Sequence, residues 1–329
     1  MTLYLLLGFS SAALALFLTP VIGRGSTLLG LVDAPGGRKV HAQSVPRLGG
    51  LAVVSAAALA FLLVQSFVPD SREPALWPSL QPLVVGGLLI FLAGLVDDVR
   101  GLGPVPKLAV EFLAAGVVMS SGLLIERITI LGATWMLGWL AFPITAAWLV
   151  GLTNAFNLID GVDGLAPGIA ALAGAACGAI LIVRGHAPEA MLLAAFVGAL
   201  LGFLVYNFEP ASIFLGDSGS LVAGFLLAAT AIAGWQKGAT ALASAVPLLI
   251  FALPLGDVAS TLLRRAVARP SSGRSIRSVL RNIAQPDREH IHHRLLALGW
   301  SVRRTVIILY GVTALLSILA LATAQVDGR

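Results

Sequence analysis

The sequence predicts an all-α integral membrane protein, a single domain over residues 1–329 that crosses the bilayer with about ten helices. Hydrophobic residues make up 58% of the chain and charged residues only 11%, whereas soluble domains carry roughly 25% charged residues. The mean hydropathy is +0.94, and apolar runs of about 20 residues, enough to cross a bilayer, recur along the chain. A soluble globular domain is therefore excluded, and the single cysteine, Cys177, excludes a disulfide framework.

The apolar runs locate the helices in chain order. The first run begins at Leu3, is too long for a signal-peptide core and lacks a positively charged start, so a retained helix is expected. Residues 126–132 alternate polar and apolar side chains and predict a short β-hairpin at the membrane surface. Pro247 and Pro254 are expected to kink the ninth helix. The expected helices span residues 3–22, 48–68, 79–96, 107–122, 136–153, 165–184, 189–207, 218–235, 240–262 and 305–324.

The positive charges predict the orientation of these helices. Sixteen of the 21 lysines and arginines fall in or beside the loops that follow odd-numbered helices, and five fall on the other side. Short cytoplasmic loops carry the excess of lysine and arginine in membrane proteins. Both termini are therefore expected outside the cell, with the odd-numbered loops in the cytoplasm and the protein in the inner (plasma) membrane.

One polar stretch interrupts the apolar chain between the fifth and sixth helices. Residues 154–166 hold two asparagines, two aspartates and two glycines. A carboxylate in hydrocarbon costs at least ~2.5 kcal/mol, so an uncompensated one is rare. If the stretch is helical, Asn154, Asn157 and Asp160 fall near one face and offer oxygens to a metal, a sugar or a nucleotide. The alternative is an ordinary polar loop, because Asn, Asp and Gly are also common turn residues.

The other polar motifs all fall in the loops assigned to the cytoplasm. They are VDAPGGRKVH followed by PRLGG in residues 32–50, the pair Asp97 and Asp98, FLGDSGS in residues 214–220, and HIHHR in residues 290–294. No outward loop has a comparable cluster. Each motif alone also fits a helix cap or an interfacial loop, but their shared side predicts a functional site on the cytoplasmic face.

The residue types in these motifs predict phosphoryl transfer. Aspartate and asparagine oxygens suit Mg²⁺, which commonly bridges carboxylates and substrate phosphates, with Mn²⁺ as an alternative. The Gly-Asp-Ser-Gly turn is expected to open a helix whose free backbone N–H groups attract phosphate oxygens. Nearby lysine, arginine and histidine side chains could hold a diphosphate. An ion-coupled transporter is the competing class, but the carboxylates gather at one face and no inverted repeat of the motifs appears.

These motifs, in this order, resemble those of the polyprenyl-phosphate N-acetylhexosamine-1-phosphate transferase family. The resemblance runs from residue 32 to residue 300 and includes NAFNLIDGVDGLA and HIHHRL. It implies transfer of an N-acetylhexosamine 1-phosphate from a UDP-sugar donor to a polyprenyl (undecaprenyl or decaprenyl) phosphate, with release of UMP. It also implies a lipid bilayer around the enzyme and no nucleic-acid partner, while the oligomeric state stays open, with a homodimer as one expectation.

The resemblance also implies roles for individual residues. It makes Asp217 the main Mg²⁺ ligand, helped by Asn157 or Asn154, while Asp97 and Asp98 orient or deprotonate the lipid phosphate. The uridine pocket would include Asp160, Gly161, Val162, Asp163, Asn207 and Phe214, and Lys107 and Arg294 would contact the donor. The expected catalytic set is Asp97, Asp98, Asp160, Asp163, His290, His292 and His293.

Two departures from a related branch bear on the donor. The phospho-N-acetylmuramoyl-pentapeptide transferases usually carry a triple histidine and NLTDG, whereas this chain has HIHHR and NLIDG, with Gly101 where that branch keeps a lysine. UDP-N-acetylglucosamine is therefore the expected donor, in the branch that starts O-antigen, teichoic-acid or arabinogalactan-type cell-envelope glycans. The muramoyl-pentapeptide reaction remains the alternative.

Overall fold

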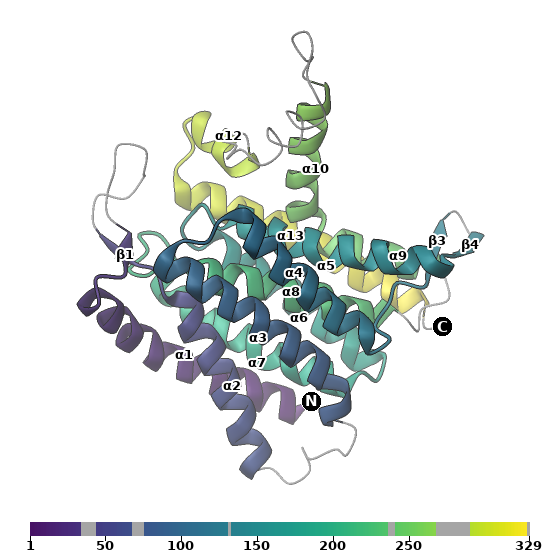
Figure 1. Cartoon of the computed structure of the whole chain (residues 1–329), viewed down its shortest axis with the longest axis horizontal. Helices are drawn as coiled ribbons and strands as arrows, with labels where there is room; N and C mark the ends of the chain where they lie inside the picture. The colour runs from purple at the N-terminus through teal and green to yellow at the C-terminus, as the bar shows by residue number, and fades with distance from the viewer. Residues whose placement is uncertain (34–43, 68–75, 131–132, 236–240, 268–289, 328–329) are drawn as a thin grey trace.

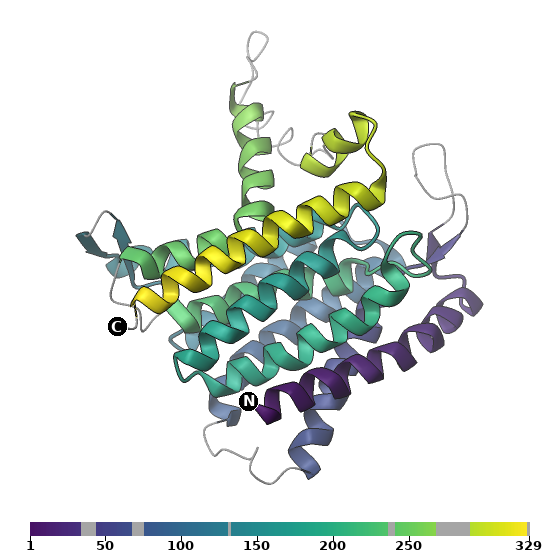
Figure 2. The ribbon, with the colours of Figure 1, turned by 180° about the vertical axis from the view of Figure 1, so that it is seen from behind.

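The computed structural model describes residues 1–33, 44–67, 76–130, 133–235, 241–267 and 290–327 as a bundle of long helices (Figures 1 and 2). Residues 34–43, within the first motif, and 268–289, in the basic loop, lie outside the described residues. The helices are α1 (Thr2–Leu28), α2 (Gly49–Phe67), α3 (Leu76–Arg100), α4 (Pro104–Ser120), α5 (Ala141–Ile159), α6 (Leu165–Val183), α7 (Ala187–Asn207), α8 (Asp217–Trp235), α9 (Ala241–Ile250), α10 (Ala252–Val267), α12 (Ile291–Ala297) and α13 (Val302–Asp327).

Helix α8 forms the centre of the bundle. It packs against α2, α3, α5 and α6, and most of its residues are buried. Glycines allow this close approach: a methyl group at Gly50 of α2 would lie 2.2 Å from the Gly219 backbone nitrogen, and one at Gly94 of α3 would lie 2.6 Å from the Asp217 carbonyl oxygen. The small residues thus bring α2 and α3 directly onto the first turn of α8.

The composition and the helices make this an all-α, multi-pass membrane protein. Eight of the helices in the described ranges are long and apolar enough to cross a membrane. Helix α4, with 17 residues, and α9, with 10, are shorter. Large apolar side chains such as Phe9, Leu62 and Phe112 are exposed on the outer faces of the bundle, as expected for helices whose surroundings are lipid rather than water.

Two short antiparallel hairpins lie at opposite ends of the bundle (Figure 1). Strands β1 (Val32–Asp33) and β2 (Val45–Pro46) pair at one end. Strands β3 (Arg127–Ile130) and β4 (Ala133–Met136) pair at the other, which confirms the hairpin predicted after the fourth helix. The one-turn 3₁₀ helix η2 (Gly138–Leu140) leads from β4 into α5. Both chain termini lie towards the β3–β4 end, away from β1 and α12 (Figures 1 and 2).

The prediction of one ninth helix over residues 240–262 was wrong. Helix α9 ends at Ile250, and α10 begins at Ala252 and leaves the bundle (Figure 1). Pro254 has no N–H to donate to the Ile250 carbonyl, so the helical ladder is interrupted where the chain turns. Pro247 lies inside α9 without ending it. The second proline therefore converts the predicted kink into a break.

Candidate active site

A cavity of about 940 Å³ opens at the end of the bundle that carries β1 and α12. Its walls come from the ends of α3 and α5, the start of α8, the two loops that follow α5 and α7, strand β2 and the α12–α13 corner. Seven acidic residues line it, whereas Arg47 and His293 are its basic members. The acidic residues that line it are Asp33, Asp97, Asp98, Asp160, Asp163, Glu209 and Asp217.

Two of the sequence motifs hold each other through their backbones. The Phe214 N–H donates to the Pro46 carbonyl at 2.8 Å, and the Gly49 N–H donates back to the Phe214 carbonyl at 2.9 Å. The Gly50 N–H continues the pairing to Leu215 at 2.7 Å. PRLGG therefore pairs through its backbone with the loop before α8, and the two motifs together form one wall of the cavity.

Asp98 occupies the N-terminus of α8. Its carboxylate accepts hydrogen bonds from the backbone N–H groups of Asp217 at 2.8 Å and Ser218 at 3.0 Å, and from the Ser218 hydroxyl at 2.5 Å. The next two N–H groups, of Gly219 and Ser220, donate to the Gly216 carbonyl. The expectation that this helix end offers free N–H groups to phosphate was therefore wrong, because a carboxylate of α3 already satisfies them.

Lys107 joins two carboxylates at the edge of the cavity. Its ammonium lies 3.1 Å from Asp97 Oδ2 and also forms an ion pair with Asp217 Oδ2. Asp97 in addition accepts a hydrogen bond from the Leu102 N–H. The three charged side chains are between 17% and 25% exposed, so the ammonium neutralises carboxylates that remain accessible from the cavity.

The two asparagines of the central stretch lie on α5, one turn apart. Asn157 donates to the Ser220 hydroxyl at 3.1 Å. Asn154 instead donates its amide to the Glu111 carboxylate and to the Val150 carbonyl. Asn157 is thus directed toward the first turn of α8, whereas Asn154 is engaged by α4.

The loop after α5 is tied to the loop after α7. The Gly164 N–H donates to Asn207 Oδ1 at 3.0 Å, and Asn207 Nδ2 donates to the Ile213 carbonyl at 2.8 Å. Asp163 accepts from the Ala211 N–H at 2.9 Å. Asn207 is buried and has its amide engaged on both sides, so it holds the two cavity walls together.

Asp160 ends α5 as its C-terminal cap and faces the cavity. Burial raises the pKa of its carboxyl well above the usual value, and the charges of Asp217, Asp98 and Asp163 raise it further. The site therefore holds a cluster of acidic groups that disfavours full ionisation unless a cation is present.

The histidine motif begins α12. His293 lines the cavity, whereas His290 and His292 are buried and their rings stack at a centroid distance of 5.8 Å. His292 lies against the loop after α5, since a methyl group at Gly161 would be 3.1 Å from His292 Nε2. Burial and the neighbouring His293 lower the pKa of His292 to about 4, so its ring is neutral at pH 7.

Comparison with known proteins bears on this site. The profile of glycosyl transferase family 4 matches residues 80–235. A probable undecaprenyl-phosphate N-acetylglucosaminyl 1-phosphate transferase of Bacillus subtilis is 33% identical, over 93% of this chain and 81% of its own length. The chain belongs to glycosyl transferase family 4. This confirms the resemblance carried by the sequence motifs.

Other relatives carry similar names. The decaprenyl-phosphate N-acetylglucosaminephosphotransferase of Mycolicibacterium smegmatis is 34% identical over 93% of this chain and 78% of its own length. The undecaprenyl-phosphate alpha-N-acetylglucosaminyl 1-phosphate transferase of Escherichia coli K12 is 28% identical over 88% and 75%. All three relatives are thus named as transferases that act with a polyprenyl phosphate.

The structure of this family 4 transferase brings most of the predicted site residues to one cavity. The predicted residues that line the cavity are Asp97, Asp98, Asp160, Gly161, Val162, Asp163, Asn207, Phe214, Asp217 and His293. The six other predicted site residues do not line the cavity. They are Lys107, Asn154, Asn157, His290, His292 and Arg294, of which Arg294 is exposed on α12.

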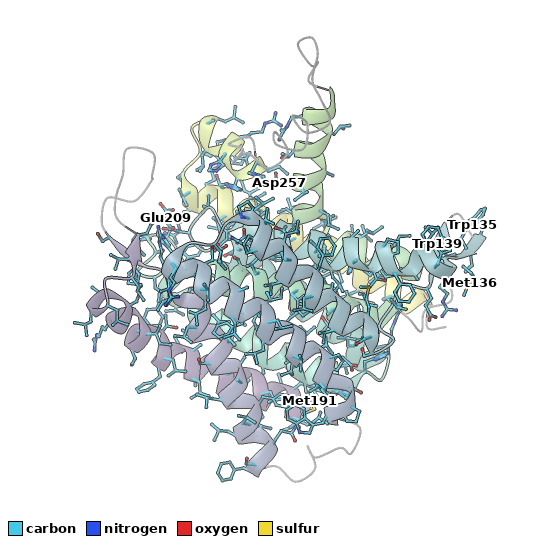
Figure 3. The ribbon with its side chains drawn as sticks, viewed as in Figure 1. Trp135, Met136, Trp139, Met191, Glu209 and Asp257 are labelled. Atoms are coloured by element: carbon cyan, nitrogen blue, oxygen red, sulfur yellow. The ribbon has the colours of Figure 1, made fainter. Side chains whose placement is uncertain are left out.

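Four residues that the sequence did not single out as site residues belong to this region. Asp33 and Arg47 form an ion pair on the β1–β2 hairpin at the cavity wall. Their motif was recognised, but the pairing of two residues separated by thirteen others leaves no local sequence signal. Glu209 lines the cavity, and buried Asp257 contacts His290 from α10 (Figure 3). Asp257 follows Pro254 by three residues, and this proximity is the sequence signal that could have pointed to it.

Proposed function

We propose that this enzyme transfers N-acetylglucosamine 1-phosphate from UDP-N-acetylglucosamine to a polyprenyl phosphate and releases UMP. The observation that supports this proposal most directly is the convergence of six aspartates from four separated motifs on one cavity. Its volume of about 940 Å³ is at the upper end of ordinary small-molecule sites, which suits a nucleotide sugar. The names of the relatives support both the acceptor and the donor sugar.

In the proposed reaction, an oxygen of the lipid phosphate attacks the donor phosphorus that bears the sugar. The bond from that phosphorus to the bridging oxygen breaks, and the bridging oxygen leaves with UMP. A phosphate monoester has a second pKa near 6, so at pH 7 the acceptor needs little help in losing its proton. We therefore assign Asp97 to positioning the acceptor, and Asp98 to holding the start of α8, where its oxygens are already engaged.

We propose Mg²⁺ as the cofactor, with Mn²⁺ as an alternative. In the described part of the chain, no three His, Cys, Asp or Glu side chains are grouped to hold a metal. Two carboxylates with substrate phosphates suffice for Mg²⁺, however, and Asp97 and Asp217 already converge on one cation, the Lys107 ammonium. Asp217 would be the principal ligand and Asn157 its neighbour. The bound ion would offset the negative charge of the diphosphate as UMP leaves.

We assign the basic residues of the site to recognition of the diphosphate. Lys107, Arg47 and His293 lie in or beside the cavity, and charge-assisted hydrogen bonds to phosphate are among the stronger polar interactions. Lys107 can exchange a carboxylate for a phosphate oxygen without leaving the site. Arg294 is the outermost candidate, on the exposed side of α12.

We propose that the cavity opens to the cytoplasm and that both termini lie outside. The excess of lysine and arginine in loops of the cavity side supports this orientation. Ten crossings of the inner (plasma) membrane would require α4 and the α9–α10 pair to cross in addition to the eight longer helices. A homodimer remains compatible with this arrangement.

The proposal is tested with purified enzyme, undecaprenyl phosphate, Mg²⁺ and radiolabelled UDP-N-acetylglucosamine. The label should appear in a lipid-extractable product, and labelled UMP should exchange into the donor only when polyprenyl phosphate is present. A transporter would show neither reaction. Transfer from UDP-N-acetylmuramoyl-pentapeptide alone would overturn the donor assignment while leaving the reaction type intact.

A further inference from the structure

We propose that Asp257 of α10 is a positioning residue that holds the histidine motif against the cavity by fixing the orientation of His290. This inference rests on the proposed transfer reaction, and it concerns a residue outside the five motifs. Asp257 lies at the base of α10, facing α12 (Figure 3). Its influence on the cavity would pass through His290 and the rest of α12.

The contacts of Asp257 are specific and buried. Its Oδ2 lies 2.8 Å from His290 Nδ1, and its Oδ1 accepts the Ile291 backbone N–H at 2.7 Å. Asp257 is 1% exposed and His290 is 5% exposed. A carboxylate this deeply buried is stable only when its oxygens are hydrogen-bonded, and here both partners come from the first residues of α12.

Helix α12 needs this contact because it is short. It has seven residues, and its N-terminal cap residue, His290, makes no side-chain capping bond of its own. Helices of this length are marginal without tertiary contacts. The Asp257 carboxylate supplies the missing cap from another helix and also places a negative charge at the positive end of α12.

The position of α12 determines the position of two further histidines. The His290 ring stacks on that of His292, and the His292 and His293 rings are 4.3 Å apart between centroids. His292 abuts Gly161 in the loop after α5, and His293 lines the cavity. A shift of His290 would therefore be transmitted to both the cavity lining and the loop beside it.

The Asp257 carboxylate also selects one tautomer of His290. A carboxylate only accepts hydrogen bonds, so His290 must carry its proton on Nδ1. In Asp257→Asn the side-chain oxygen can still accept the Ile291 N–H, but the amide NH₂ then faces His290 Nδ1 and donates to it. The ring should change to the Nε2–H tautomer while the helix cap survives.

The first experiment reads this tautomer directly. The chain has only five histidines, so ¹⁵N-histidine labelling yields a simple spectrum in which His290→Gln assigns one ring. The wild-type spectrum should show His290 protonated on Nδ1, and Asp257→Asn should move that proton to Nε2. Identical His290 signals in the two proteins would overturn the proposal, whether or not the enzyme transfers N-acetylglucosamine 1-phosphate.

The second experiment measures transfer. Asp257→Asn should melt within a few degrees of wild type yet lose activity by about 10- to 100-fold, as when a partner that orients a functional histidine is removed. Ser260→Ala is the matched control, since Ser260 lies on the same helix and bonds the Asp257 carbonyl rather than its carboxylate. It should retain wild-type activity.

A double mutant separates action through His290 from a general structural effect. If Asp257 acts through His290, Asp257→Asn combined with His290→Gln should be no slower than the slower single mutant. Additive losses, or wild-type activity in Asp257→Asn, would overturn the proposal.

Should Asp257→Asn fail to fold, Asp257→Glu keeps the charge and both acceptors, and it must show the Nδ1–H tautomer. If wild type itself transfers nothing, the proposed function fails, and the tautomer result stands separately.

Discussion

At the scale of single residues, the site combines carboxylates that face the cavity with carboxylates that hold its walls. Asp97 and Asp98 are adjacent in sequence, yet Asp97 pairs with Lys107 and Asp98 caps α8. Asp217 pairs with the same lysine and follows the capped turn. Sequence reasoning could recognise the pair as functional but could not divide the two roles, because the division depends on which carboxylate reaches another helix.

Replacing Asp217 should abolish most activity without unfolding the protein. Asp217→Asn keeps the shape of the side chain but removes the charge that Lys107 and a divalent cation would share. We expect transfer to fall on the order of 100-fold or more, with partial recovery at high Mg²⁺ if metal occupancy is the defect. The matched control is Glu126→Gln, an exposed carboxylate near β3, which should leave turnover unchanged. Near-normal turnover of Asp217→Asn would remove Asp217 from the metal site.

The folding stability of the enzyme without divalent cations should fall as the pH rises, because of the Asp160 carboxyl group. Its pKa is raised in the folded state by burial and by neighbouring carboxylates, so above the ordinary value of 3.8 the folded protein holds a proton that the unfolded chain has lost. Stability contributed by this group is therefore lost with increasing pH through that window. Asp160→Asn removes the titration. Its melting temperature should exceed that of wild type at about pH 8 and approach it near pH 4, while transfer activity falls.

The measurement is a pair of melting curves in detergent across that range, without divalent cations. A wild-type protein that is more stable than Asp160→Asn at about pH 8 would contradict the assignment. Added Mg²⁺ should narrow the difference, because a bound cation favours the ionised carboxyl groups. The expected gain in stability and loss of activity in one variant would indicate that the acidic cluster serves function at the expense of the fold.

At the scale of elements, the apolar runs were sufficient to find most helices. Nine of the ten expected segments correspond to single helices, from α1 to α8 and α13, with ends that differ by at most six residues. The interrupted ninth segment and the short helix α12 were not anticipated. Hydropathy reports on the length of an apolar run, whereas the break before Pro254 and the cap on α12 depend on one missing N–H and one distant carboxylate, Asp257.

The contact between α3 and the start of α8 should be intolerant of added volume. In Gly94→Ala, the new methyl group would lie 2.6 Å from the Asp217 carbonyl oxygen and from the Ser218 backbone. Because these atoms are backbone, the helices must separate, at a cost of roughly 1–3 kcal/mol. The Asp98 cap would be disturbed with them, so both the melting temperature and the activity should fall.

Gly116→Ala is the control for this effect. Gly116 lies on α4, and a methyl group there meets nothing within 4 Å, so the substitution should be neutral or slightly stabilising through helix propensity. Equal melting temperatures for the two alanine variants would show that the close approach of α3 to α8 does not limit stability.

At the scale of the whole molecule, the bundle has two chemically different ends. One end holds the acidic cavity, the β1–β2 hairpin and α12, and the other holds the β3–β4 hairpin with exposed Trp135 and Trp139 (Figure 3). Tryptophan favours the membrane–water interface, so the second end fits the headgroup level of a leaflet. From the sequence alone, the motifs were expected to lie together on one side of the membrane. This expectation needs only the number of helices that separate one loop from the next.

The orientation of these ends can be read by labelling single cysteines in intact cells. The native Cys177 is buried and would be replaced by alanine. Ser121→Cys then places an exposed thiol at the end of α4 away from the cavity, and Ser212→Cys places one at the cavity wall. Both are serine-to-cysteine changes at exposed positions, so they form a matched pair. A membrane-impermeant maleimide should label position 121 in intact cells and position 212 only after permeabilisation, because the positive charges favour a cytoplasmic cavity. Labelling of position 212 but not position 121 in intact cells would reverse the proposed topology and would put the cavity on the wrong side for a cytoplasmic nucleotide-sugar donor.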